Sequence, residues 1–144
     1  AVGGIKRGSA YVFRRNKCNW LEDSKLVPDE ANDYMFFGED IAIQGDVVIV
    51  GAENDDDLGP STGAAYVFSR STGSWIQDSK ILPADASGGV VTGTRFGTSI
   101  DLDNDKAVIG GSPGIRGKVY MYDLSNENVA FPPKDKVCFD GCHP

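Results

Sequence analysis

Histidine is almost absent from this chain of 144 residues: the single one, His143, lies one position from the C-terminus. A histidine-based triad or proton relay needs an imidazole that is firmly held, and chain ends are commonly loosely held. No pair of carboxylates stands out as a hydrolytic pair either, although acids are plentiful. We therefore expect a protein that is not an enzyme, and a polysaccharide hydrolase is the weakest of the alternatives.

Basic residues and long apolar runs are also scarce. The chain has 14 Lys and Arg against 21 Asp and Glu, a net charge of −7, so no basic face is expected for nucleic acid. No apolar run reaches the length of about 18 residues that a membrane span requires. The opening residues AVGGIKRG lack the hydrophobic stretch of a signal peptide. We expect no membrane span, and a secreted form would be a mature or trimmed one.

Cysteines are few and odd in number: Cys18, Cys138 and Cys142. An odd count in a secreted chain leaves one thiol free or paired between chains. A Cys138–Cys142 disulfide would close a small loop near the C-terminus, and a bridge from Cys18 to this region is equally open. A zinc ion bound by Cys138, Cys142 and His143 would lack a fourth ligand, which favours the disulfide.

What the chain does contain is a tandem repeat. The hexapeptide at Gly8–Phe13 (GSAYVF) returns at Gly63–Phe68 (GAAYVF), 55 residues later, and more weakly at Gly117–Tyr122 (GKVYMY). Several anchors recurring in one order establish an internal repeat. The other anchors are Trp20 with Trp75, Asp23–Leu26 with Asp78–Ile81, Phe37-Gly38 with Phe96-Gly97, and Val48–Gly51 with Ala107–Gly110.

Each repeat is predicted to form four short strands and no helix. In the most complete copy these are Glu39–Gln44, Val47–Ala52, Ala64–Arg70 and Trp75–Leu82. Gly45-Asp46 between the first two strands favours a tight hairpin turn. The second and third strands are apolar on successive residues, which indicates burial on both faces. The fourth carries Asp78 and Lys80 mid-strand, as suits an outer edge.

These features resemble the FG-GAP repeat, known from integrin α-chain heads and from surface proteins of microbes. Phe37-Gly38 and Phe96-Gly97 correspond to its FG, and Gly51-Ala52-Glu53 and Gly110–Pro113 correspond imperfectly to its GAP. The likeness extends over residues 1 to about 123. It implies an extracellular β-propeller that serves adhesion or ligand binding.

The predicted fold is therefore all-β: tandem four-stranded antiparallel blades in an incomplete propeller-like array of about 2.5 blades, whereas closed propellers need at least about four. Residues 1–35 are expected to form a partial blade of third and fourth strands, and residues 36–83 a complete one. Residues 84–123 would supply three strands of another, and residues 124–144 a tail with room for an extra strand and the disulfide.

Too few blades leave apolar faces and strand edges uncovered. Three explanations remain open: a segment of a longer propeller, an open solenoid-like stack, or a protomer completed by its neighbours into a ring or filament. In the last case a neighbour ending in the first three strands would complete the partial blade at the N-terminus.

One acidic loop is a candidate calcium site. Calcium takes about 6–8 oxygen ligands, so closely spaced acids are its signature. The loop offers Glu53, Asn54, Asp55 and Asp57, and a solvated acidic loop is the alternative. The resemblance also points to the turn at Asp101–Asp105, but that segment lacks the glycine and the closing acid of a calcium loop.

Aromatic residues recur at matched positions in the third strand, where we predict packing between blades and assembly. A sugar-stacking platform is the alternative. We expect an extracellular structural or adhesive protein that acts through contacts with itself, other blades or a cell-surface protein; a ligand- or glycan-binding head is the second choice. The aromatic set is Tyr11, Phe13, Tyr66, Phe68, Tyr120 and Tyr122.

Overall fold

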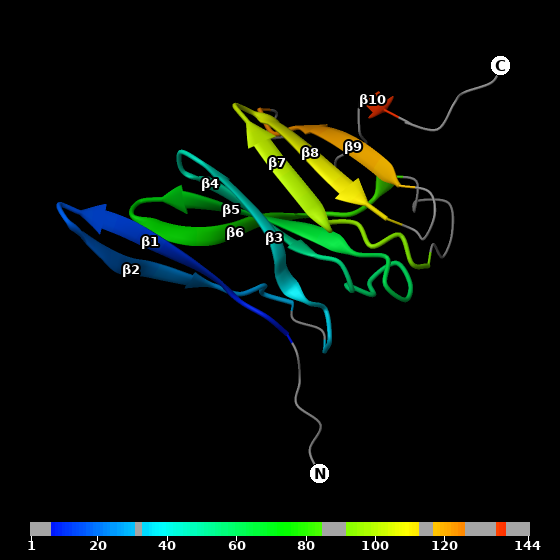
Figure 1. Ribbon diagram of the computed structural model, residues 1–144, viewed down its shortest axis with the longest axis horizontal. Coiled ribbons are helices and arrows are strands. Elements are labelled where there is room, and N and C mark those ends of the chain that lie inside the picture. The colour runs from blue at the N-terminus through cyan, green and yellow to red at the C-terminus, as the bar shows by residue number, and fades with distance from the viewer. Residues whose placement is uncertain (1–6, 31–32, 85–91, 113–116, 126–134, 138–144) are drawn as a thin grey trace, which may run out of the picture.

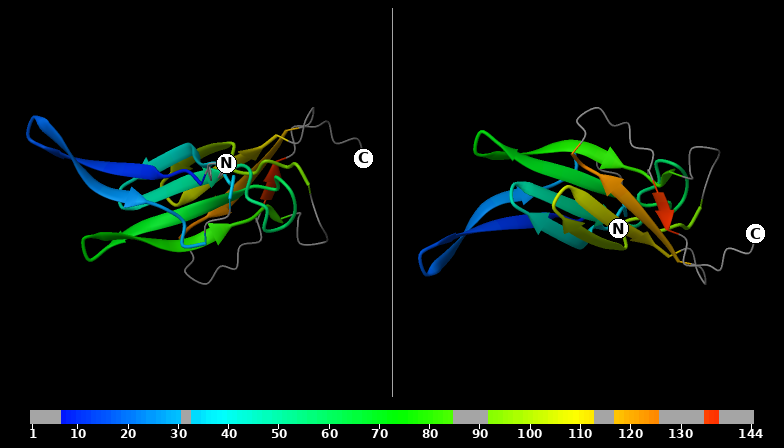
Figure 2. Two further views of the ribbon diagram at one scale, coloured as in Figure 1. Left: turned by 90° about the horizontal axis from the view of Figure 1, so that it is seen from below. Right: turned by 90° about the horizontal axis from the view of Figure 1, so that it is seen from above.

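The computed structural model describes residues 7–30, 33–84, 92–112, 117–125 and 135–137. Within these ranges ten β-strands form three antiparallel sheets, one of two strands and two of four (Figure 1). The sheets stand side by side, with the two-stranded sheet at one end of the row (Figures 1 and 2). The predicted all-β array of antiparallel blades is confirmed.

We call the three sheets the first, second and third blade. The first blade contains β1 (Ala10–Asn16) and β2 (Asn19–Leu26). The second contains β3 (Phe37–Gln44), β4 (Val47–Ala52), β5 (Ala64–Ser71) and β6 (Ser74–Ile81). The third contains β7 (Ser99–Asp103), β8 (Lys106–Gly111), β9 (Lys118–Asp123) and β10 (Asp135–Val137).

Three strands of the third blade lie between residues 84 and 123, and a fourth lies in the region 124–144, where the sequence left room for an extra strand. β10, from the C-terminal region, pairs antiparallel with β9 and places Lys136 opposite Tyr120. The same pairing joins Tyr11 to Lys25 in the first blade and Tyr66 to Lys80 in the second. β10 is thus the fourth strand of its blade, and a neighbour is not needed to pair with the outer edge of β9.

The tight turns contain residues with positive φ, and the predicted hairpin turn at Gly45-Asp46 is confirmed. Gly45 (φ 57°) and Asn104 (φ 51°) begin the turns after β3 and β7. Thr72 (φ 51°) and Gly73 (φ 89°) form the turn between β5 and β6. These turns fix the register in which the neighbouring strands pair.

The apolar core lies between the blades rather than within one. β4 sends Val48 and Val50 into a cluster shared with the first blade, and Ile49 into a cluster shared with the third. β5 divides in the same way, because Tyr66 faces the first cluster and Val67 the second. The predicted burial of these two strands on both faces is confirmed, and it arises because each is sandwiched by neighbouring blades.

Candidate interaction surface

Consecutive blades are joined at a glycine and a phenylalanine. Gly8 forms a parallel bridge with Phe37, and Gly63 forms the same bridge with Phe96. The Phe37 amide donates to the Arg7 carbonyl at 3.1 Å, and the Phe96 amide to the Thr62 carbonyl at 2.9 Å. We call this contact the glycine–phenylalanine joint.

Only glycine fits at the joint. A Cβ on Gly8 would lie 1.9 Å from the Phe37 carbonyl oxygen, and one on Gly63 would lie 2.2 Å from that of Phe96. Both glycines also have φ above 80°, where other residues are strained. The first residue of the repeated hexapeptide is therefore explained by backbone contact between blades.

Each joint packs two different kinds of face together. The phenylalanine makes edge-to-face contacts within its own blade: Phe37 with Tyr66 (5.5 Å between centroids) and Phe96 with Tyr120 (5.1 Å). Further rings lie 6.0 Å away in both blades. We call this side of a blade its aromatic face, formed by Phe37, Tyr66 and Phe68 in the second blade and by Phe96, Tyr120 and Tyr122 in the third.

The opposite side of a blade is its aliphatic face, and it packs on the aromatic face of the next blade. In the second blade it consists of Ile49, Ala65, Val67 and Ile81. In the first blade Ala10 and Leu26 are buried in the corresponding place, and Val12 packs partly against the same cluster. Aliphatic-on-aromatic packing therefore occurs twice along the chain.

Polar contacts tie the blades together across these faces. The Trp75 indole Nε1 donates to Asp23 Oδ2 of the first blade at 3.1 Å. The Ile100 amide of the third blade donates to Asp40 Oδ2 of the second at 2.6 Å, and the Tyr122 hydroxyl donates to the Leu82 carbonyl at 3.2 Å. Each joint thus combines apolar packing with directional bonds that fix how the blades are aligned.

The aromatic face of the first blade is uncovered. Tyr11 and Phe13 are 48% and 51% exposed, whereas Tyr66 and Phe68 at the same repeat positions are 0% and 3% exposed. Tyr120 and Tyr122 are buried too. Of the six aromatic residues predicted to pack between blades, four lie in the clusters and two lie at the surface, because no described sheet precedes the first blade.

A second uncovered area lies at the edge of β1. Within the described residues β1 pairs only with β2, whereas β5 has a strand on each side. Beside this edge an apolar groove of about 200 Å³ is lined by residues of β1 and β2 together with Ile41, Ile43 and Val48. Ile43 is 58% exposed, while Leu102, its counterpart in the third blade, is 9% exposed. No sequence pattern singles out Ile41 or Ile43; they are found only when burial is compared between equivalent positions of the repeat.

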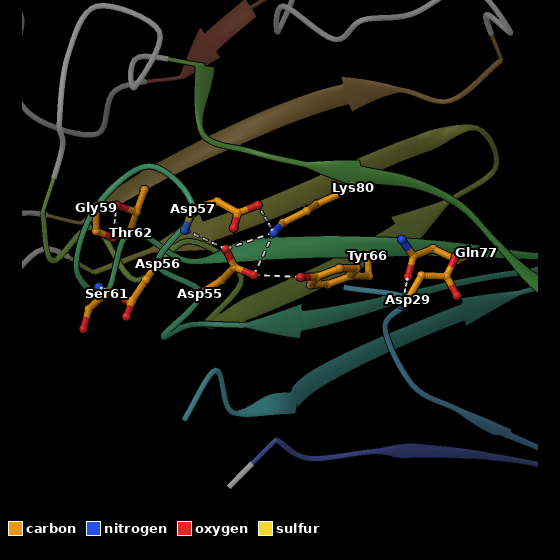
Figure 3. A network of polar contacts seen from close by, with 10 residues as sticks. All are labelled: Asp29, Asp55, Asp56, Asp57, Gly59, Ser61, Thr62, Tyr66, Gln77 and Lys80. Atoms are coloured by element: carbon orange, nitrogen blue, oxygen red, sulfur yellow. Dashed lines mark hydrogen bonds and ion pairs between the residues drawn. The ribbon is translucent and has the colours of Figure 1, made fainter. Parts of the chain in front are cut away.

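The acidic loop after β4 contains a buried ion pair (Figure 3). Asp55 is fully buried; its Oδ2 accepts from the Tyr66 hydroxyl at 2.7 Å and lies 2.9 Å from the Lys80 ammonium. Lys80 also pairs with Asp57 and lies over the Tyr66 ring, 5.1 Å from its centroid. The network fastens the loop to β5 and β6.

The two equivalent tyrosines differ in acidity. Burial, followed by the hydrogen bond to Asp55, raises the pKa of Tyr66 well above its ordinary value. Hydrogen bonds to Ser9 and to Lys25 lower the pKa of the exposed Tyr11. The same Tyr–Lys pair therefore occupies a dry, acid-bound setting in one blade and a solvated one in another.

The loop predicted to bind calcium is arranged around a lysine. Asp55 and Asp57 both bind Lys80, while Glu53 accepts from the Thr98 hydroxyl at 3.5 Å and the Asn54 amide donates to the Met35 carbonyl at 3.3 Å. Across the described part of the chain, no group of three or more acidic, His or Cys side chains is placed to hold a metal. Calcium stays a prediction without geometric support, and Lys80, facing Tyr66, is the residue that the sequence reasoning missed.

The cysteine predictions fall largely outside the described residues. Cys138, Cys142 and His143 are not among them, and Cys18 has an exposed, free thiol at the β1–β2 turn. In the described ranges no helix is long and apolar enough to cross a membrane.

The comparison with protein families agrees with the repeat. The family model described as FG-GAP repeat matches residues 20–68, from β2 to Phe68 in β5. The matched segment includes Phe37, the phenylalanine of the first joint. A search of curated proteins gave no match to the chain. The β-blades, their joints and this match agree, and residues 20–68 of the chain are an FG-GAP repeat.

Proposed function

We propose that this chain is an extracellular structural or adhesive repeat protein that acts through protein–protein contacts made by its end blades. One observation carries the proposal: Tyr11 and Phe13 are about half exposed although their repeat counterparts are buried against a neighbouring blade. Exposed apolar area of this kind marks an interaction site. The resemblance to surface proteins supports the extracellular setting.

The chemistry of the uncovered face supports a protein partner. Trp20, 67% exposed on β2, occupies the repeat position of Trp75, whose indole donates to Asp23 of the preceding blade. The face therefore offers an indole N–H beside two apolar rings, which is the arrangement that receives a blade elsewhere in the chain. Aromatic residues of this sort are enriched at interfaces.

A site-specific crosslink tests the proposal. We would place a photo-crosslinking phenylalanine analogue at Phe13 and, as a matched control, at Ile76, which is exposed on β6. The experiment would use the native extracellular material that contains the chain. The expected result is a protein adduct at position 13 and none at position 76. Equal labelling at both positions, or adducts with glycans alone at position 13, would contradict the proposal.

A further inference from the structure

The third blade presents the kind of face that covers the aromatic faces inside the chain. Val108, Val119 and Met121 stand at the repeat positions of Ile49, Ala65 and Val67, the aliphatic face of the second blade. The strand register is the same, because Val108 pairs with Met121 as Ile49 pairs with Val67. The third blade thus carries an aliphatic face built like those inside the chain.

This aliphatic face is partly uncovered. Met121 is 38% exposed and Val108 and Val119 are half-buried, whereas their three counterparts in the second blade are buried against the third. The first and third blades lie at opposite ends of the row (Figure 1). Among the described residues, the first blade therefore leaves its aromatic face uncovered and the third leaves its aliphatic face partly uncovered.

We propose that a second copy of this chain packs the aliphatic face of its third blade on the aromatic face of the first blade, head to tail. The inference rests on the proposed function and names the partner of the same surface. Among the described blades, this pairing of an aliphatic with an aromatic face forms both contacts between neighbours. A symmetric contact of two aromatic faces has no such precedent in the described residues.

The arrangement has a consequence for assembly size. A head-to-tail contact uses two different surfaces, so each added copy leaves one of each uncovered. Association then continues into a ring if the rotation closes and into a filament if it does not. A contact of like faces would instead stop at a dimer.

Sedimentation velocity of the full chain over a wide concentration range tests the inference. We expect wild type to form species larger than dimers. The paired change Tyr11→Asp with Phe13→Asp, at one end, and Met121→Asp, at the other, should each weaken self-association at least about 100-fold, because each sets a carboxylate against an apolar face. Ile76→Asp is the matched control at an exposed aliphatic residue and should associate as wild type does.

Mixing the two end variants distinguishes the modes of contact. Each variant keeps one intact face, so an equimolar mixture should form a dimer and nothing larger. Thermal unfolding confirms that each variant is folded before it is used. A wild type that stays monomeric, or a Met121→Asp variant that associates normally, would overturn the inference. A retained protein crosslink at position 13 with a monomeric wild type would leave the proposed function standing and reject self-association alone.

Discussion

β1 and β5 are nearly the same strand in two environments. Both contain the AYVF of the related hexapeptides GSAYVF and GAAYVF, and each pairs with a following strand that places a lysine opposite the tyrosine. Their pairing registers even break at the same place, between Val12 and Phe13 in one and between Val67 and Phe68 in the other. Yet the tyrosine and phenylalanine of β5 are buried and those of β1 are exposed.

The comparison distinguishes structural features that follow from the sequence of one repeat from those that depend on a neighbouring blade. The turn, the register and the bulge are local, so both copies have them. Burial of the aromatic face depends on a preceding blade, and in the second blade also on Phe37 of its own first strand. Substitutions at matched positions of the repeat should therefore have unequal effects on stability.

The largest difference in the free energy of unfolding is expected between substitutions of the two equivalent lysines. Lys80→Met leaves the buried Asp55 carboxylate without its ammonium partner, which should lower the free energy of unfolding by about 3–5 kcal/mol. Lys25→Met, in the first blade, removes a cation lying 5.6 Å from the exposed Tyr11 ring and should change it by less than about 1 kcal/mol. Urea denaturation of both variants measures the difference.

A second substitution tests the cause at Lys80. Adding Asp55→Asn to Lys80→Met should restore part of the lost stability, because no charge is then left buried. Additive losses in the double variant would show that the two residues do not act as an ion pair.

The next largest difference in stability is expected between substitutions of two equivalent glycines. Gly63→Ala sets a Cβ against the Phe96 backbone at positive φ and should cost at least about 2–3 kcal/mol. Gly117→Ala is the matched change in the third blade, where the nearest atom to a Cβ is the Gly111 carbonyl oxygen at 3.8 Å. That variant should unfold as wild type does in thermal denaturation. Equal losses at both sites would contradict the role given to the joint.

A smaller effect is expected from removing one hydroxyl. Tyr66→Phe deletes the donor to Asp55 and should cost about 1.5–3 kcal/mol, the range for hydrogen bonds to charged groups. Tyr11→Phe, at the exposed position, should be close to neutral. Denaturant midpoints at neutral pH measure both, and a Tyr11→Phe loss as large as that of Tyr66→Phe would break the comparison.

The smallest effect concerns the pH dependence of stability. The folded pKa of Tyr66 is raised, so its contribution is fully present below the unfolded tyrosine pKa of about 10 and is lost as pH rises beyond that toward the folded value. Wild type should therefore lose stability in alkali, and Tyr66→Phe should remove part of that slope. Carbon-13 NMR of labelled tyrosines should show Tyr11 ionising before an ordinary tyrosine and Tyr66 only as the protein unfolds. Simultaneous titration of the two would refute this account.

The repeat made the strands and their burial predictable. The apolar runs of β4 and β5 predicted two buried faces, and Asp78 and Lys80 placed β6 at an outer edge, as observed. These features are local, because they follow from the order of apolar and polar residues along one strand. Four of the aromatic positions also lie between blades, where the recurrence of tyrosine and phenylalanine had indicated them.

Long-range partners were harder to predict. Asp55 and Lys80 lie 25 positions apart. A run of acidic residues indicates that a cation is bound, but it does not indicate whether the cation is a metal ion or a lysine of the same chain. β10 lacks the tryptophan and the Asp-Ser-Lys pattern of β2 and β6, so only Lys136 opposite Tyr120 identifies it. Exposure of Tyr11 and Ile43 depends on strands that the first blade lacks in the described residues, which no local pattern encodes.

The glycine–phenylalanine joint also indicates where the chain tolerates changes in length. Between the second and third blades the repeat gains four residues, and all lie between Lys80 and Phe96, ahead of the joint. The spacing from Phe37-Gly38 to Gly51 is the same as that from Phe96-Gly97 to Gly110, because backbone contact with the previous blade constrains the segment. A peptide grafted ahead of Phe96 should therefore be displayed on a row of blades whose spacing does not change, while one extra residue between Phe96 and Gly110 should disrupt the row.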